Sequence, residues 1–150
     1  MRKGITIIEI VVAIALAAVI FGLGVAALNP GGQLASARNS QRTAHVNALV
    51  NAIRANITDN RTGAFLCAGT GDIPTSSKKM AVGQGNYDIA PCLVPVYLFA
   101  MPFDPSATNA RYASNADYDT GYFVIKNAST GQVTVSAPSA ELGKTISVIR

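Results

Sequence analysis

The chain has no tryptophan, a single histidine and few charged residues, which make up 13% of its 150 residues. A histidine that binds a metal or acts in catalysis needs partners, and His45 has no second ligand at a fixed helical offset. The sequence also lacks a Ser/His/Asp set, paired carboxylates in an apolar pocket and a glycine-rich phosphate loop after a strand. It therefore predicts no enzyme, no cofactor and no metal, with His45 in a structural role.

Neither positive nor negative charge is in large excess. The formal net charge is +4, which is too mild to indicate nucleic acid as a partner by itself. DNA therefore has no support from composition. The roughly 120 residues that follow Leu28 are rich in Ala, Ser, Thr, Asn and Gly, which implies a small hydrophobic core.

Only two cysteines are present, Cys67 and Cys92. Their spacing fits no metal motif. Because oxidising compartments preserve disulfides and small cores need them, the pair predicts a disulfide in an exported domain. Such a bridge would contribute about 3.5 kcal/mol on chain-entropy grounds. The alternative is a pair of unlinked thiols in a cytosolic protein.

One long apolar run extends from Gly4 to Leu28, behind the basic residues Arg2 and Lys3. As a helix, residues 5–28 would be about 36 Å long, enough to cross a bilayer core of about 30 Å. The only charged residue in the run is Glu9, and a carboxylate in hydrocarbon costs at least about 2.5 kcal/mol. Glu9 therefore needs a cation, and a cut after Gly4 would supply one in the new α-amino group one helical turn away.

The order Arg2-Lys3-Gly4, a cut, a hydrophobic residue and a Glu four positions later resembles the prepilin signal of type IV pilins and pseudopilins. In that family, a membrane peptidase cleaves after the Gly and N-methylates the new first residue, and the Glu neutralises the N-terminus of a neighbouring subunit. The resemblance implies that Gly4 is the cleavage residue, Ile5 the methylated terminus and Glu9 the docking carboxylate. Most members have Phe at the position of Ile5.

The resemblance also implies what the chain does and where it acts. It predicts a leader at 1–4, an apolar helix at 5–28 and an exported domain at 29–150. The expected function is that of a structural subunit, a major pilin, of a type IV pilus or related filament, which is a helical homo-oligomer. The expected partners are prepilin peptidase, the assembly machinery in the bacterial cytoplasmic membrane and, before assembly, membrane lipid. After assembly the filament would lie at the cell surface.

Other functions fit parts of the same pattern. The chain could be a pseudopilin or minor pilin of a type II secretion or DNA-uptake system, or a monomeric, membrane-anchored binding domain outside the cytoplasm. The N-terminal run could also be an ordinary secretory signal or a plain signal anchor. These last two interpretations leave Glu9 unexplained.

Beyond the apolar run, the sequence Asn29-Pro30-Gly31-Gly32 is expected to break or kink the helix. Residues 33–60 then fit an amphipathic helix. Its apolar residues recur at helical spacing and gather on one face: Val46, Leu49, Val50, Ile53 and Ile57. Its basic residues are expected to flank that face as part of a solvated surface: Arg38, Arg42, Arg54 and Arg61.

Residues 62–95 contain many glycines and prolines and are expected to be irregular, with Lys78-Lys79 as an exposed charge pair. Residues 93–104 are apolar and predict a short helix or an extended stretch over the core. A turn is expected to begin at Asp104-Pro105.

Three strands are expected at the C-terminal end. Residues 122–125 and 132–136 flank a turn sequence and predict a hairpin, and the alternating residues 145–149 predict a third strand. The expected fold class is α+β. A long N-terminal helix would pack on a small antiparallel sheet of about three to four strands at about 112–150, as in type IV pilins.

Two further motifs are weak. Asn115, Asp117 and Asp119 place oxygen atoms at alternate positions as calcium loops do, but without the Gly and closing Glu of an EF-hand, which favours a plain turn. Matches to the N-glycosylation pattern begin at Asn56, Asn60 and Asn127. A chain rich in Asn, Ser and Thr produces such matches by chance.

Overall fold

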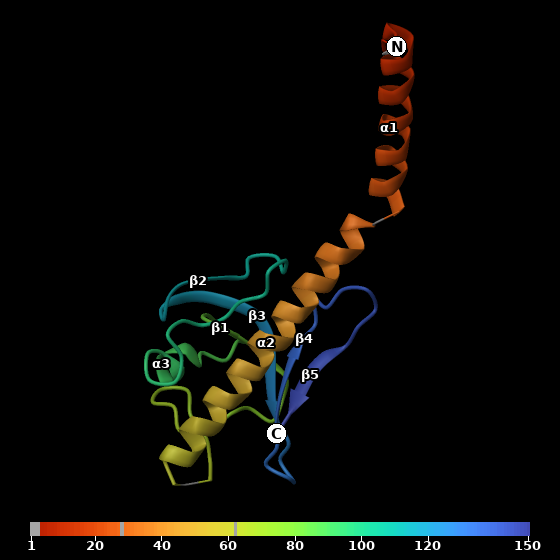
Figure 1. Cartoon of the computed structure of the whole chain (residues 1–150). Helices are drawn as coiled ribbons and strands as arrows, with labels where there is room; N and C mark the ends of the chain where they lie inside the picture. The colour runs from red at the N-terminus through yellow and green to blue at the C-terminus, as the bar shows by residue number, and fades with distance from the viewer. Residues whose placement is uncertain (1–3, 28, 62) are drawn as a thin grey trace. The chain divides into compact units, whose positions relative to one another are not determined.

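The computed structural model describes residues 4–27, 29–61 and 63–150 and divides into two compact units, Met1–Ala35 and Ser36–Arg150. The first unit holds helix α1, Ile7–Ala27, and the start of helix α2, Pro30–Asp59. The second unit holds the rest of α2 and all the strands (Figure 1). Residues 1–3 of the expected leader, Leu28 of the expected apolar run and Thr62 lie outside the described residues.

The expected interruption between two helical parts is present, and its position has a simple cause. Proline is tolerated at the first position of a helix, where its missing N–H has no partner to lose, and α2 begins at Pro30. The Asn29 side chain accepts a hydrogen bond from the Gly32 N–H at 3.2 Å and caps the helix. Gly31 and Gly32 therefore belong to α2 rather than to the break.

The fold is α+β, with an N-terminal helix, α2, packed on an antiparallel sheet of five strands, more than the three to four expected. The strands are β1 Lys78–Ala81, β2 Arg111–Ser114, β3 Asp117–Lys126, β4 Val133–Ala137 and β5 Ile146–Ile149. The sheet order is β1-β3-β4-β5, and β2 pairs with the beginning of β3.

The predicted hairpin and third strand are confirmed by the strand pairing. Phe123 lies opposite Ser136 in the β3–β4 pair, and Val135 lies opposite Val148 in the β4–β5 pair. Strand β1 lies in the segment expected to be irregular. Its four residues, KKMA, become a strand because they pair with β3, for example Lys79 with Phe123.

The amphipathic face of α2 covers one side of the sheet, as its spacing predicts (Figure 1). Val46, Leu49, Val50 and Ile53 are fully buried, and Ile57 packs at the edge of the same cluster. Sheet residues in this cluster include Tyr122, Val124, Val133 and Val135. The alternate residues of β3, Phe123 and Ile125, are partly exposed and lie outside the cluster. The helix therefore covers only one face of the sheet.

Candidate functional site

The residues assigned to processing and docking lie at the start of α1. Gly4 and Ile5 precede the helix, and Ile5 is 74% exposed. The N–H groups of Glu9 and Ile10 donate hydrogen bonds to the Thr6 carbonyl oxygen at 3.1 and 3.3 Å, which places Glu9 in the first turn. A carboxylate is favoured there because it lies near the positive end of the helix dipole. Ile5 therefore lies just before the helix, four positions ahead of Glu9 in its first turn.

Helix α1 presents an uncovered apolar surface. Its exposed large apolar residues are Ile7, Ile8, Ile10, Val11, Val12, Ile14, Leu16, Val19, Ile20 and Phe21. Glu9 is also exposed, and none of the ion pairs recorded among the described residues includes it. An apolar surface of this extent is typical of a segment that contacts another molecule.

The membrane span expected over 5–28 is not found. Within residues 4–27, 29–61 and 63–150, no helix combines the length and the apolar character needed to cross a membrane.

A buried arginine is the main polar feature of the second unit. The side chain of Arg42 is 0% exposed. Its Nε and Nη2 donate to the two carboxylate oxygens of Asp104 at 2.8 and 3.1 Å, and its Nη1 donates to Glu141 Oε2 at 2.8 Å. Arg38 binds the same Glu141 through two hydrogen bonds of 2.7 and 2.6 Å. The expectation that Arg42 is solvated is therefore wrong, because two loops distant in sequence bring carboxylates over it.

The four charged groups of this cluster stabilise one another in their ionised forms. The pKa of Glu141 is lowered to about 2, mainly by its hydrogen bonds with Arg38 and, to a smaller extent, by its hydrogen bond with Arg42. Burial alone would raise the pKa of Asp104, but hydrogen bonds from Arg42 and from the Ser106 and Ala107 N–H groups outweigh it, so the pKa is lowered. The hydrogen bond to Asp104 raises the pKa of Arg42. All these groups are charged at neutral pH, and together they attach two loops to α2.

We expect the free energy of unfolding to fall as the pH is lowered from about 4.5 to about 2. Glu141 keeps its ordinary pKa of 4.5 when unfolded and has a pKa of about 2 when folded. Between these values the unfolded state binds more protons, so acid favours unfolding. Urea unfolding measured across this interval would show the decline. The Glu141→Gln variant should decline less steeply; an identical pH dependence in that variant would exclude this cause.

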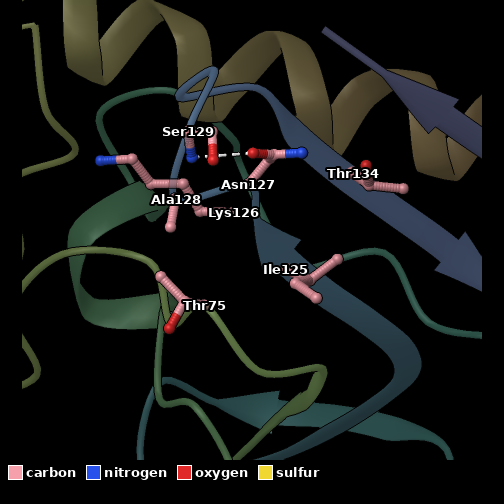
Figure 2. A pocket seen from close by; sticks show the side chains of 7 residues that line it. All are labelled: Thr75, Ile125, Lys126, Asn127, Ala128, Ser129 and Thr134. Carbon is pink, nitrogen blue, oxygen red and sulfur yellow. Dashed lines mark hydrogen bonds between the residues drawn. The ribbon is translucent and has the colours of Figure 1, made fainter.

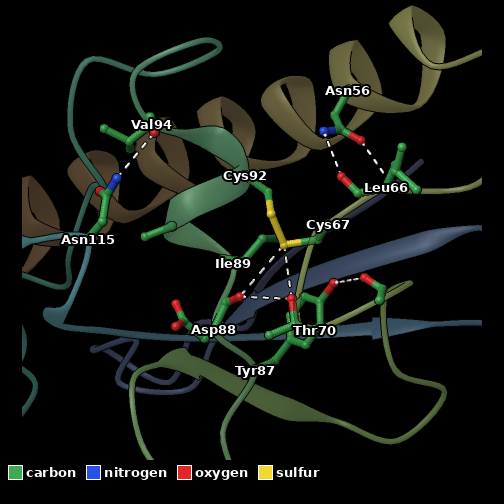
Figure 3. The surroundings of a disulfide bond; sticks show 12 residues. Asn56, Leu66, Cys67, Thr70, Tyr87, Asp88, Ile89, Cys92, Val94 and Asn115 are labelled. Atoms are coloured by element: carbon green, nitrogen blue, oxygen red, sulfur yellow. Dashed lines mark hydrogen bonds between the residues drawn. A yellow bond between two sulfur atoms is a disulfide. The ribbon is translucent and has the colours of Figure 1, made fainter.

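The expected disulfide joins Cys67 and Cys92, whose Cα atoms lie 5.3 Å apart (Figure 3). The Thr70 hydroxyl donates to Cys67 Sγ at 2.9 Å. Asn56 on α2 holds the adjoining residue, since its amide donates to the Leu66 carbonyl at 3.2 Å and accepts from the Leu66 N–H at 3.0 Å. The bridge therefore ties the segment between the cysteines, which includes β1, to α2 and to helix α3, Ala90–Leu93.

The remaining candidates have local structural partners. His45 contacts the Tyr122 hydroxyl at 3.0 Å, and burial lowers its pKa, in agreement with a structural role. Asp117 pairs with Arg111, and Asp119 pairs with Lys79. The expectation of an exposed Lys78-Lys79 pair is therefore wrong, because β1 lies beside β3 and both lysines are half-buried there.

Metal-ligand clusters and glycosylation motifs do not identify a functional site among the described residues. Across the described ranges, no group of three or more His, Cys, Asp or Glu residues is arranged to hold a metal ion. Among the glycosylation motifs, Asn56 is buried, and the motif that begins at Asn60 ends at Thr62, outside the described residues.

No protein-family model, curated protein or solved structure matches this chain.

Proposed function

We propose that this chain is a structural subunit of a type IV pilus or a related filament. The observation that carries the proposal is the exposed apolar surface of α1 with a single carboxylate, Glu9, in its first turn. Gly4 and Ile5 stand directly before that turn and are exposed, where a peptidase can reach them. The same arrangement supports the resemblance to a prepilin signal.

Assembly would follow from the physical chemistry of α1. Cleavage after Gly4 would give Ile5 a positively charged amino group. In a filament, apolar helices exchange contacts with lipid for contacts with one another. An unpaired charge in such a core is costly, so Glu9 of one subunit would pair with the amino terminus of a neighbour. A wrong axial step would leave two charges unmatched, and the pair would therefore set the register.

The second unit has features suited to a domain outside the cytoplasm. The Cys67–Cys92 disulfide is of the kind that oxidising compartments preserve. Before assembly the subunit would be held at the bacterial cytoplasmic membrane, with prepilin peptidase and the assembly machinery as partners, and it would then enter a filament at the cell surface. This placement follows from the proposed role of α1.

The test is the N-terminus of the protein recovered from sheared cells. We expect the fibre fraction to contain the chain, and mass spectrometry to show that it begins at a methylated Ile5. The matched variant is Gly4→Val, which should block cleavage by bulk and remove the chain from the fibres. A Cβ at Gly4 meets no atom within 4 Å, so the described fold has room for it.

Two results would refute the proposal. One is a chain in surface fibres that still carries Met1. The other is a dispersed monomer that never enters the fibre fraction, which would favour a membrane-anchored binding domain.

A further inference from the structure

A hollow in the second unit is lined by two arginines. It has a volume of about 210 Å³ and lies between the C-terminal half of α2, the turn that joins β3 to β4, and the residue that follows β5. Its charged lining residues are Arg54, from α2, and Arg150, from the chain after β5, and both are exposed. We call it the arginine hollow. Two like charges at one surface hollow favour an anion as its ligand.

The two guanidinium groups are unpaired within the described chain. Among the described residues, no recorded ion pair or hydrogen bond includes the guanidinium of Arg54 or of Arg150. A larger hollow of about 420 Å³, whose walls include Thr75 and the end of β3, differs in this respect (Figure 2). Its only charged lining residue, Lys126, pairs with Asp72. The larger hollow is therefore already neutralised, whereas the charge of the arginine hollow is available to a ligand.

Main-chain bonds hold the two arginines in place. Arg54 lies within α2, where its carbonyl accepts a hydrogen bond from the Thr58 hydroxyl at 2.9 Å. The main chain of Arg150 exchanges two hydrogen bonds with Val133, at 2.7 and 2.9 Å, which fixes it beside the start of β4. The Thr58 hydroxyl is thus already used as a donor, and a bound anion would be held by the two guanidinium groups.

The second unit has no unengaged carboxylate that could fill the hollow of another copy. Every carboxylate between Ser36 and Arg150 has a recorded partner; for example, Asp72 binds Lys126 and Asp88 accepts from the Tyr118 hydroxyl. The exposed Glu9 belongs to the first unit and supplies a single negative charge. The charges therefore favour a ligand other than a second copy of this chain.

The chemistry of the hollow favours a doubly charged oxyanion. Guanidinium groups bind phosphate oxygens through paired N–H bonds. A phosphate monoester carries a charge of about −1.5 to −2 at neutral pH, which matches two guanidinium groups, whereas a carboxylate or a phosphodiester carries a single charge. Ile57 and Val133 also line the hollow, and apolar walls strengthen the attraction between opposite charges by lowering the local dielectric constant.

We propose that the arginine hollow binds a phosphate monoester group, held between Arg54 and Arg150. A soluble phosphate ester and a lipid headgroup that ends in a phosphate present this same group. The site lies in the second unit, and binding there requires neither α1 nor assembly into filaments.

Calorimetric titration of the purified full-length chain in a neutral detergent tests the site. Glycerol phosphate is the soluble probe, and a short-chain phosphatidic acid is the lipid probe. We expect saturable binding of one molecule per chain, with a lower Kd for phosphatidic acid if the ligand is a lipid and equal Kd values if it is a soluble ester. Binding should weaken as the pH falls through about 6, where a phosphate monoester takes up its second proton.

Substitution of the arginines identifies the residues that hold the ligand. Arg54→Gln and Arg150→Gln should each raise the Kd about tenfold or more, as expected for the loss of hydrogen bonds to a charged group. The control, Lys144→Gln, removes the same charge from an exposed residue that does not line the hollow, and its Kd should stay close to that of the wild type. Because all three side chains are exposed, urea unfolding of the variants should match the wild type.

Three results would overturn the inference. They are the absence of saturable binding of both probes, an equal loss of binding in Lys144→Gln, and equal affinity for dimethyl phosphate. Dimethyl phosphate is a diester, so the last result would assign the hollow to singly charged groups such as those of a nucleic-acid backbone. None of these results bears on filament formation, so a failure of this inference is distinct from a failure of the proposed function.

Discussion

Replacing Arg42 with methionine is expected to lower the free energy of unfolding by about 3–5 kcal/mol, the usual cost of breaking a buried ion pair by removing one partner. Methionine has a similar reach and fills much of the same space. The loss therefore arises from the Asp104 carboxylate, which is buried and would keep only the Ser106 and Ala107 N–H groups as partners. Urea unfolding of the variant and of the wild type gives the difference.

The matched control is Arg38→Met on the same helix. Arg38 pairs with Glu141 at a partly exposed site, where ion pairs contribute at most about 1 kcal/mol. The Arg38 variant should therefore remain close to the wild type. If Arg42→Met were destabilised no more than Arg38→Met, the buried cluster would have no special part in holding the loops at 104 and 141 on α2.

Replacing Glu9 with valine is expected to abolish or strongly reduce the proposed filaments while leaving the second unit folded. Glu9 is exposed and lies in the first turn of α1, outside the second unit, so the substitution removes only the favourable interaction with the helix dipole, about 1 kcal/mol at most at an exposed site. In the proposed filament it would leave the amino terminus of a neighbour as an unpaired cation in an apolar core. The measurement is the amount of the chain in the sheared fibre fraction.

The control for this variant is Val12→Ala, which changes the same exposed apolar helix without touching a charge. It should assemble almost normally. Fibres of normal yield from Glu9→Val would refute the docking role of Glu9, whereas equal loss in both variants would show that α1 tolerates no change and that the charge is not the cause.

Much of the second unit follows from local patterns. The apolar spacing from Val46 to Ile53 predicts the buried face of α2, and the alternation in β4 predicts a strand with one buried face. The two cysteines predict their own bridge, since no other partner is available to either. In the helix and in the strand, burial repeats at the period of the element, so the residues of one short stretch are enough to predict it.

Other features depend on residues that are far apart in the chain. Strand β1 has no pattern of its own and exists because β3 supplies its hydrogen bonds. Residues 94–103 are visible as an apolar run, but the sequence favours covering the core with them, and only the fold shows Phe99 in solvent. The helix break is predicted at 29–32, whereas the Asn29 cap determines that α2 begins at Pro30.

By itself, the sequence determined the α+β class, the amphipathic helix, the C-terminal hairpin and the position of the lone carboxylate in the apolar run, because each depends on residues within a few turns or strand lengths. The tertiary structure alone decided that Arg42 is buried and that one face of the sheet stays open. Whether a side chain is buried, and which charged groups pair with it, depends on loops that approach it from distant parts of the sequence. Asp104 and Glu141 reach Arg42 from 62 and 99 positions away, a distance at which no local period carries information.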